Sequence, residues 1–422
     1  MGAGGARFSG FLRRVPSMPA FRALKHRDFR LLWFGAIISF TGVQVQSVAQ
    51  GYLVYEMTGD EAMLGLVMFA SLAPVSLLGP VLGVFSDVLD RRKVMIIASI
   101  VLALGAAFLG TAAHFGFIEY WHIVAIALMN GFVTTLENPA RQSIVREVVP
   151  EYDITAAVPS MGMTFNFARV AGPAIGGLLT GTVGPEWCFW INALSFAGMI
   201  VASLMIRADL SPMQREPQPV RDLIMEGMLY TLRDKALRTL FLLESVTSFF
   251  GIFYLGLMAA IAKDMLGLDP KGLGAAMSSV GMGALLGLGL LVSIAHKPWK
   301  PLIVRIAMSV FAVALLAMGF VHTPWIAYIL FGFMGACTML QFNTTNTLFQ
   351  IIAPANLRGR VLSMHMWAVM GVSPFGVLFF GWLATQTSLA TAFWVGGAAM
   401  TVGAVFAWAL RSRVYEPALS PQ

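Results

Sequence analysis

Long apolar stretches alternate with short polar ones along the whole chain. Residues 63–86 contain no ionisable side chain, and neither do residues 94–113, whereas segment 87–93 between them reads Asp-Val-Leu-Asp-Arg-Arg-Lys. About 20 apolar residues are enough for a helix to cross the hydrocarbon layer of a membrane. The pattern around segment 87–93 therefore predicts two membrane-spanning helices joined by a charged turn.

Twelve such spans are predicted in the whole sequence. In the first half they are expected near 30–56, 62–87, 93–114, 120–147, 153–183 and 186–207. In the second half they are expected near 238–263, 271–296, 301–321, 324–352, 358–386 and 388–411. The predicted fold class is an all-α membrane protein whose twelve transmembrane helices form two pseudo-symmetric six-helix bundles.

The predicted domain organisation follows from these spans. A cytoplasmic N-terminal segment covers residues 1–29, the N-terminal bundle 30–207 and the C-terminal bundle 238–411, before a cytoplasmic tail at 412–422. The polar linker 208–237 separates the bundles, and an amphipathic helix is expected from Val220 to Arg238, on the membrane surface. Four basic side chains of this helix would face the lipid headgroups: Arg221, Arg233, Lys235 and Arg238.

The composition agrees with a membrane protein. Apolar residues make up 58% of the chain and charged residues 12%, whereas a soluble domain carries about 25% charged residues. The mean hydropathy is +0.76. The net charge of +7 would suit nucleic-acid binding, but the charges lie in short loops rather than on one face, which excludes that class. Cys188 and Cys337 lie in apolar runs without metal-ligand spacing and are expected to be small core residues.

The distribution of Lys and Arg predicts the orientation in the membrane. With the N-terminus inside, the outer loops contain only Lys263 and Lys271, and Arg169 lies within a span. The other basic residues then lie at or near the inner side, as the positive-inside rule requires. The first thirty residues are basic, are broken by Pro16 and Pro19, and do not resemble a signal peptide. We therefore expect a multi-pass protein of the bacterial inner membrane with both termini in the cytoplasm.

The two halves of the sequence also resemble each other. An offset of 204 residues without gaps pairs Gly131 with Gly335 and Gly177 with Gly381, and superposes the fourth and fifth spans on the tenth and eleventh. A parallel repeat of two six-helix halves, with a substrate site near the midplane between them, is typical of one class of membrane transporter.

Three stretches of the chain resemble the major facilitator superfamily, and within it the drug and siderophore exporter branch that includes the enterobactin and macrolide exporters. They are Phe21–Arg30, Asn138–Ser143 followed by Val148–Glu151, and Asn166–Gly177. The resemblance extends over essentially the whole chain. It implies the major facilitator fold and transport by alternating access.

Segment 83–93 resembles the signature loop between the second and third helices of this superfamily. The resemblance implies a gating role for Gly83, Asp87, Arg91, Arg92 and Lys93. The equivalent loop of the second half has degenerated, so this role is expected in the first half only. Asp87 would stabilise one conformation by bonding to a helix N-terminus of the opposite half. The alternative is that Asp87 is a solvated loop charge.

Small residues surround a proline in the fifth span. Gly172, Pro173, Gly176 and Gly177 form a surface that favours close contact with a neighbouring helix and a local bend. The resemblance associates this stretch with exporters and so favours efflux. The alternative is that this stretch is an ordinary kinked packing helix that says nothing about the direction of transport.

Charged residues inside the spans are the candidates for coupling, because a charge within a membrane is costly and marks a functional site by default. Glu137 and Arg141 lie four residues apart on one face of the fourth span and can pair. Arg169, in the middle of the fifth span, is placed where it can approach Glu137. These residues form either a structural ion pair or a protonatable site that couples transport to protons. Glu244, in the seventh span, is interpreted as a snorkelling or locally paired surface charge, with a proton or substrate role as the alternative.

Polar and aromatic residues of the central spans are the candidates for substrate binding. The cavity is expected between the first, fourth, seventh and tenth spans, with contributions from their neighbours. The 26 methionines of the chain suit an adaptable apolar pocket. The candidate residues are Gln44, Gln50, Asn166, Phe249, Phe253, Gln341, Asn343, Asn346 and Trp367.

Together these features favour a secondary active transporter that couples protons to the efflux, by antiport, of small amphipathic compounds such as drugs or siderophores. The sequence lacks a Gly-rich phosphate-binding stretch, a supported hydrolytic triad and metal-ligand spacing. We therefore expect no enzyme activity, no cofactor, no metal and no nucleic-acid partner, and a monomer in the lipid bilayer. The nearest alternative is an importer or lipid flippase of the same fold. A non-transporting membrane sensor or assembly partner is the alternative from another class.

Overall fold

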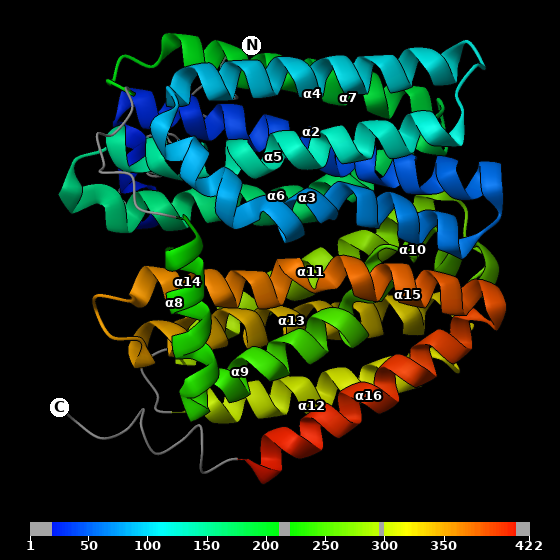
Figure 1. The fold of residues 1–422 in the computed structure, drawn as a ribbon. Coiled ribbons are helices and arrows are strands. Elements are labelled where there is room, and N and C mark those ends of the chain that lie inside the picture. Colours follow the sequence, from blue (N-terminus) through cyan, green and yellow to red (C-terminus); the bar gives the residue numbers. More distant parts are fainter. Residues whose placement is uncertain (1–18, 211–219, 295–298, 411–422) are drawn as a thin grey trace, which may run out of the picture.

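The computed structural model describes residues 19–210, 220–294 and 299–410 (Figure 1). Within these ranges, the side chains of residues 19–21, 80–81, 83–88 and 220–224 lie outside the described part. The described ranges contain helices and the connections between them, and no strand. The predicted all-α class is therefore confirmed.

Six long helices form the N-terminal bundle, in the upper part of Figure 1. Two short 3-10 helices, η2 (Pro19–Lys25) and η3 (Glu151–Asp153), precede the first and fifth of them. The six are α2 (Arg27–Thr58), α3 (Glu61–Val88), α4 (Arg91–His114), α5 (Tyr120–Glu147), α6 (Ile154–Thr180) and α7 (Pro185–Met205).

Six crossings likewise form the C-terminal bundle, and two of them are interrupted. The continuous ones are α11 (Pro270–Ile294), α12 (Lys300–Met318), α13 (Pro324–Ile352) and α16 (Leu389–Ala409). The seventh crossing consists of α9 (Lys235–Val246), η4 (Thr247–Gly251), η5 (Ile252–Leu255), α10 (Met258–Ala260) and η6 (Ile261–Met265). The eleventh consists of α14 (Arg358–Met366), η7 (Trp367–Gly371) and α15 (Ser373–Gln386).

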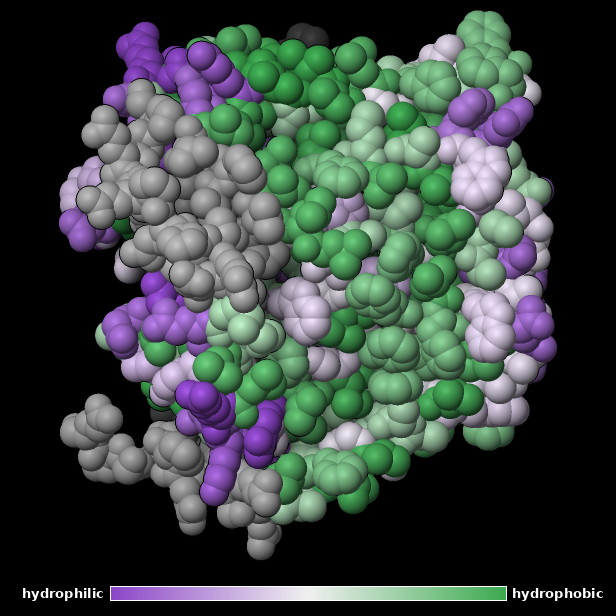
Figure 2. All heavy atoms as spheres, viewed as in Figure 1, coloured by the Kyte–Doolittle hydropathy of each residue, from purple (hydrophilic) through white to green (hydrophobic). Residues whose placement is uncertain are grey.

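Most of these crossings are apolar enough to lie in a membrane. Ten helices of the described part meet the length and hydropathy expected of a membrane span. The remaining two crossings, α5 and α6, are less apolar because they carry polar and charged residues such as Glu137 and Arg169. Figure 2 shows hydrophobic residues over the middle of the visible face and hydrophilic residues towards its two ends. This distribution is what a bundle surrounded by lipid requires.

The linker contains a helix that ends earlier than predicted. α8 (Val220–Arg233) runs across the end of the other helices in Figure 1 and contacts α14 and α3. Asp234 then accepts hydrogen bonds from the backbone N–H groups of Ala236 and Leu237, and so caps the start of α9. Because of this cap, Lys235 and Arg238 belong to the seventh crossing, and the prediction of one helix through Arg238 was wrong.

Glycine contacts reveal the pseudo-symmetry of the bundles. A Cβ atom on Gly177 of α6 would lie 2.6 Å from the carbonyl oxygen of Pro270 on α11, at the start of the eighth crossing. A Cβ atom on Gly381 of α15 would lie 2.8 Å from the carbonyl oxygen of Glu61 on α3, at the start of the second crossing. Equivalent helices of opposite halves therefore cross with almost no space between their backbones, which only glycine permits.

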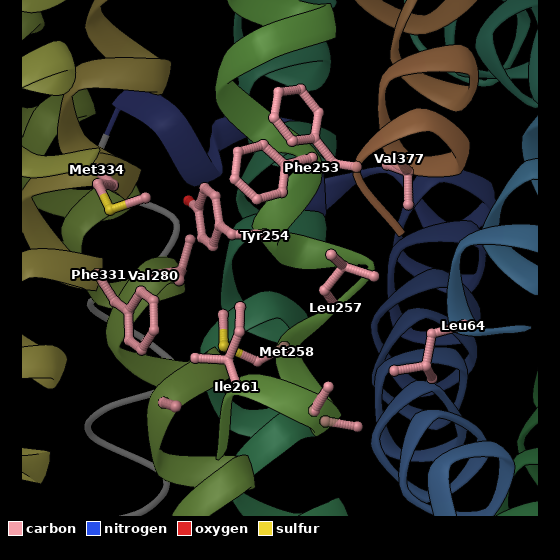
Figure 3. Close-up of a cluster of buried hydrophobic side chains, with 14 of the residues drawn as sticks. Leu64, Phe253, Tyr254, Leu257, Met258, Ile261, Val280, Phe331, Met334 and Val377 are labelled. Carbon is pink, nitrogen blue, oxygen red and sulfur yellow. The ribbon is translucent and has the colours of Figure 1, made fainter. Parts of the chain in front are cut away.

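The largest apolar core lies around the seventh crossing, where Figure 3 shows Phe253, Tyr254 and Leu257 among their neighbours. The Phe253 ring stacks on Phe380 of α15 with 4.1 Å between the ring centroids. Tyr254 stacks in the same way on Phe331 of α13. These rings fix the interrupted seventh crossing against the eleventh and tenth.

Candidate functional site: buried charges and the contact between the bundles

A glutamate and a histidine meet in the interior of the C-terminal bundle. Glu244 of α9 is fully buried, and His365 of α14 is 3% exposed. The Nδ1 atom of His365 lies 2.8 Å from Oε2 of Glu244. The interpretation of Glu244 as a snorkelling or locally paired surface charge was therefore wrong. Sequence reasoning missed His365 altogether, because only the packing of the seventh against the eleventh crossing brings it to Glu244.

Both helices that carry this pair lose α-helical geometry directly after it. The π-helical segment η4 begins three residues after Glu244, and the π-helical segment η7 begins two residues after His365. The corresponding crossings of the N-terminal half, α2 and α6, continue as α-helices. Segments of π-helix inside an α-helix occur frequently at functional sites. The Glu244–His365 pair thus lies where the two interrupted crossings can bend.

Several polar oxygens beside this pair have no hydrogen-bond partner in the described part. They include Oε1 of Glu244, Oγ of Ser248, Oε1 of Gln341 and Oγ1 of Thr344. Nε2 of Gln341 donates to Oγ1 of Thr247 at 2.8 Å, so this face of α13 meets the seventh crossing. Buried polar groups are costly when unsatisfied, and internal water commonly satisfies them. Polar side chains of the seventh crossing and of α13 therefore gather in this part of the bundle.

A second buried ion pair lies in the N-terminal bundle. Glu137 and Arg141 of α5 are 2% and 7% exposed, and the guanidinium of Arg141 bonds to the carboxylate of Glu137. The guanidinium also lies over the ring of Phe40 on α2, 4.5 Å from its centroid. The two residues predicted to pair on one helical face thus do so. Two nitrogens of Arg141 have no acceptor in the described part.

Arg169 lies apart from Glu137. In the described part its side chain has no salt bridge to the carboxylate, which Arg141 occupies instead. Arg169 lies over the ring of Phe165. Its backbone oxygen lies against Gly281 of α11. The expected approach to Glu137 is therefore not found, because this part of α6 faces the C-terminal bundle.

Polar contacts between the bundles gather at one end, which we call the Thr385 end. Thr385 of α15 lies 2.6 Å from Oδ1 of Asp60 and accepts a hydrogen bond from the N–H of Ala62. Nζ of Lys263 bonds to Glu56 at 3.2 Å. Alongside this pair, the Tyr55 hydroxyl donates to Asp264. Further in, Trp367 and Gly371 bond to Ser76 of α3. The glycine crossings at Gly177 and Gly381 lie at the same end.

Four residues predicted to form a packing surface on α6 make close contacts. All four are buried. A Cβ atom on Gly176 would lie 2.7 Å from the carbonyl oxygen of Val45 on α2, and one on Gly172 would overlap Gln44. Gly177 and the carbonyl group of Pro173 face α11. The surface thus joins α6 both to its own bundle and to the other one.

The signature loop is only partly described. Gly83 and Asp87 have side chains outside the described part, so the proposed latch at Asp87 stays a prediction. Arg91 lies 2.5 Å from Glu147, and Arg92 donates to the carbonyl oxygens of residues 206 and 208. Lys93 is exposed. The described contacts of Arg91 and Arg92 thus hold the loop to its own bundle.

The candidate cavity residues lie in several different environments. Phe253 is fully buried in the aromatic core, so its side chain is not accessible in this conformation and its assignment to the substrate site stays a prediction. Trp367 is 40% exposed and its indole N–H donates to the carbonyl oxygen of Ser76 across the bundle interface. Gln341 is buried beside Thr247. The other candidates are half-buried: Gln44, Gln50, Asn166, Phe249, Asn343 and Asn346.

A buried polar group that the sequence did not single out lies between α2 and α7. Nδ2 of Asn192 donates to Oε1 of Gln46 at 2.6 Å, and Gln46 reaches Gln50 at 3.4 Å. Gln46 lies on the face of α2 opposite Gln44, and only the packing of α2 on α7 shows that this face is buried. The group connects the candidate residue Gln50 to the interior of the N-terminal bundle.

An anchor of basic residues surrounds Asp153 in η3, outside the spans. Its carboxylate is buried, and it lies 2.7 Å from Nε2 of His26 and 2.8 Å from Nζ of Lys25. Arg22 lies 3.0 Å from the other oxygen. The hydrogen bonds from His26 and Lys25 hold the pKa of Asp153 below its ordinary value. The anchor fixes η2 to the turn between α5 and α6.

Comparison with known sequences identifies the family. The family of transmembrane secretion effectors, of the major facilitator type, matches residues 18–422, and the chain belongs to it. Macrolide efflux protein A of Streptococcus pyogenes is 22% identical over 364 residues, which cover 83% of this chain and 87% of that protein. The multidrug efflux pump Tap of Mycolicibacterium fortuitum is 24% identical over 380 residues, covering 87% and 92%.

Solved transporter structures share the fold of this chain. The nucleoside transporter NupG superposes with a TM-score of 0.75 at 13% identity, covering 91% of this chain and 99% of that one. The peptide transporter POT superposes with a TM-score of 0.76 at 12% identity, covering 92% and 94%. The protein is therefore a multi-pass membrane transporter of the major facilitator type with efflux relatives, and not an enzyme. This confirms the resemblance seen in the sequence.

Proposed function

We propose that the protein exports small amphipathic compounds, such as drugs or siderophores, in exchange for protons. It would do so by alternating access across the bacterial inner membrane, with both termini in the cytoplasm. Relatives that cover most of the chain are named efflux pumps, which supports the direction. The observation that carries proton coupling is the buried Glu244–His365 pair beside the interruptions of the seventh and eleventh crossings.

Coupling requires that protonation and bundle rearrangement depend on each other. Both members of the Glu244–His365 pair can gain or lose a proton, and each lies on a helix that carries inter-bundle contacts further along. A buried charge is costly unless paired, so a proton that changes the charge of either residue changes the stability of their contact. We infer that proton binding here favours one bend of α9 and α14 over another. Glu137 with Arg141 is the second candidate for such a group.

Alternating access is supported by the one-sided contact between the bundles. With the predicted orientation, the Thr385 end faces outward, and the contacts at Asp60, Lys263 and Gly381 close it. Substrate would then enter from the cytoplasm between the bundles. Opening the outer side requires the contacts at the Thr385 end to break, while the bundles rock about the glycine crossings.

The test is transport in everted membrane vesicles from cells with and without the protein. The vesicles are energised to acidify their interior and are supplied with a panel of fluorescent amphipathic compounds. Export in the cell corresponds to accumulation inside these vesicles, which should disappear when a protonophore collapses the gradient. Movement in the opposite direction would favour an importer. The absence of gradient-dependent movement of any compound would favour a non-transporting role and contradict the proposal.

A further inference from the structure

Arg169 is a cation between the bundles without a matching anion. It lies in the middle of α6, is half-buried, and has no hydrogen bond or salt bridge in the described part of the chain. Its described side-chain contact is the ring of Phe165, whose centroid lies 5.9 Å from the guanidinium carbon. A guanidinium at membrane depth normally has a partner, because an unpaired charge in this environment is costly.

The carboxylates inside the spans are committed to other partners. In the described part, Glu137 bonds to Arg141 and Glu244 bonds to His365. The carboxylates at the Thr385 end, Glu56 and Asp264, likewise bond to Lys263 and Tyr55. In this conformation no carboxylate of the described part pairs with Arg169, so its guanidinium is available to an anion from outside the chain.

Arg169 lies where the two bundles face each other. The backbone of Gly281 on α11 packs against the backbone oxygen of Arg169, so the C-terminal bundle lies directly beside this part of α6. The Phe165 ring, which is 47% exposed, adds an apolar surface one turn away. A guanidinium and an aromatic ring therefore lie together where the halves face each other.

We propose that Arg169 binds the anionic group of an amphipathic substrate, such as a carboxylate or phosphate, with the apolar part of the substrate against Phe165 and the facing bundle. A guanidinium presents paired donors that match a carboxylate or phosphate. A ligand held at the face between the bundles would sense their rearrangement. The inference rests on the proposed function and assigns its substrate class.

The experiment compares two probes that differ only in charge: a fluorescent naphthyl-alkanoic acid and its uncharged amide. Binding is measured with the purified full-length protein in phosphatidylcholine nanodiscs, which contain no anionic lipid. Wild-type protein should bind the acid at least about tenfold more tightly than the amide, since a hydrogen bond to a charged group is commonly worth a factor of that size. Arg169→Gln should remove this preference and leave binding of the amide unchanged. Arg169→Lys should retain part of it.

Two further measurements protect the interpretation. Arg305→Gln, at a buried arginine of α12 that lies over Trp408, is the matched control and should leave the preference intact. If phosphatidylglycerol displaces the acid, the site is supported and the bilayer is a source of the anion.

Other outcomes would overturn the inference. The inference would be wrong if the wild type bound the acid and the amide equally well. It would also be wrong if Arg169→Gln weakened binding of the acid and of the amide by the same factor while Arg169→Lys bound both probes like the wild type. Gradient-driven transport of neutral compounds would in that case still support the exporter. Failure of all gradient-driven transport, with the charge preference intact, would instead contradict the proposed function alone.

Discussion

Glu244 and His365 are 121 residues apart in the sequence, yet their side chains meet at 2.8 Å in the interior of the C-terminal bundle. The contact joins the seventh crossing to the eleventh, directly before both lose α-helical geometry. The N-terminal bundle has a different arrangement, in which Glu137 pairs with Arg141 on the same helix. The two halves share their fold but not their buried charges, which places the proposed coupling group in the second half.

Glu244→Gln should uncouple transport from the proton gradient. The amide keeps the size of the side chain but cannot exchange a proton, so gradient-driven export should fall at least tenfold while substrate–substrate exchange continues. Fluorescent substrate flux in proteoliposomes measures both processes. Glu226→Gln on α8 is the control, because Glu226 is half-exposed and pairs with Arg360 at the end of the bundle. Full gradient-driven export by Glu244→Gln would argue against the role of this residue.

His365→Leu should destabilise the protein, because it leaves a buried carboxylate without its partner. A buried polar group left without its hydrogen-bond partner costs about 1–3 kcal/mol. The double variant Glu244→Gln, His365→Leu should recover part of this loss, since a neutral amide is less costly to leave unpaired than a carboxylate. Unfolding in mixed micelles measures the coupling between the two substitutions. Additive effects of the single substitutions would mean that the pair does not interact in the native protein.

Gly65→Val should prevent the Thr385 end from closing. A Cβ atom on Gly65 would lie 2.9 Å from the carbonyl oxygen of Val377, across the contact between α3 and α15. Spin labels on the predicted outer ends of these helices should report a longer distance, and transport should decrease. Gly79→Val is a matched control on the same helix, because nothing lies within 4 Å of a Cβ atom there. Equal distances in the two variants would contradict this account of the closed end.

The Asp153 anchor predicts a pH dependence of stability. Its hydrogen bonds from His26 and Lys25 lower the pKa of Asp153 from the ordinary value of 3.8. The folded state therefore binds its proton less readily than the unfolded state, so the stabilisation is complete above about pH 3.8 and is lost as the pH falls through the lower folded value. Asp153→Asn should lower the midpoint of thermal unfolding at neutral pH. It should also reduce the loss of stability that the wild type shows as the pH falls below about 3.8. An unchanged pH profile would show that the anchor does not contribute.

The sequence predicted the number and approximate ends of the crossings because apolar length alone determines which segments can span a membrane. It did not predict the π-helical segment after Glu244, which no proline marks, whereas Pro374 follows the segment after His365 and its missing N–H favours such an interruption. The position of Glu244 along its helix could be predicted, but its pairing with His365 depends on how two helices that are distant in the sequence pack together. The same limit explains the error at Arg169, whose position on α6 was predicted while the direction it faces was not.

The central claim is that export of the substrate is coupled to proton exchange at the Glu244–His365 pair. It is tested most directly by adding a transported compound to the purified protein in weakly buffered detergent solution and recording the pH with an indicator dye. The wild type should release protons when the compound binds, and Glu244→Gln should bind the compound without releasing any. Equal proton release by the wild type and Glu244→Gln would contradict the account.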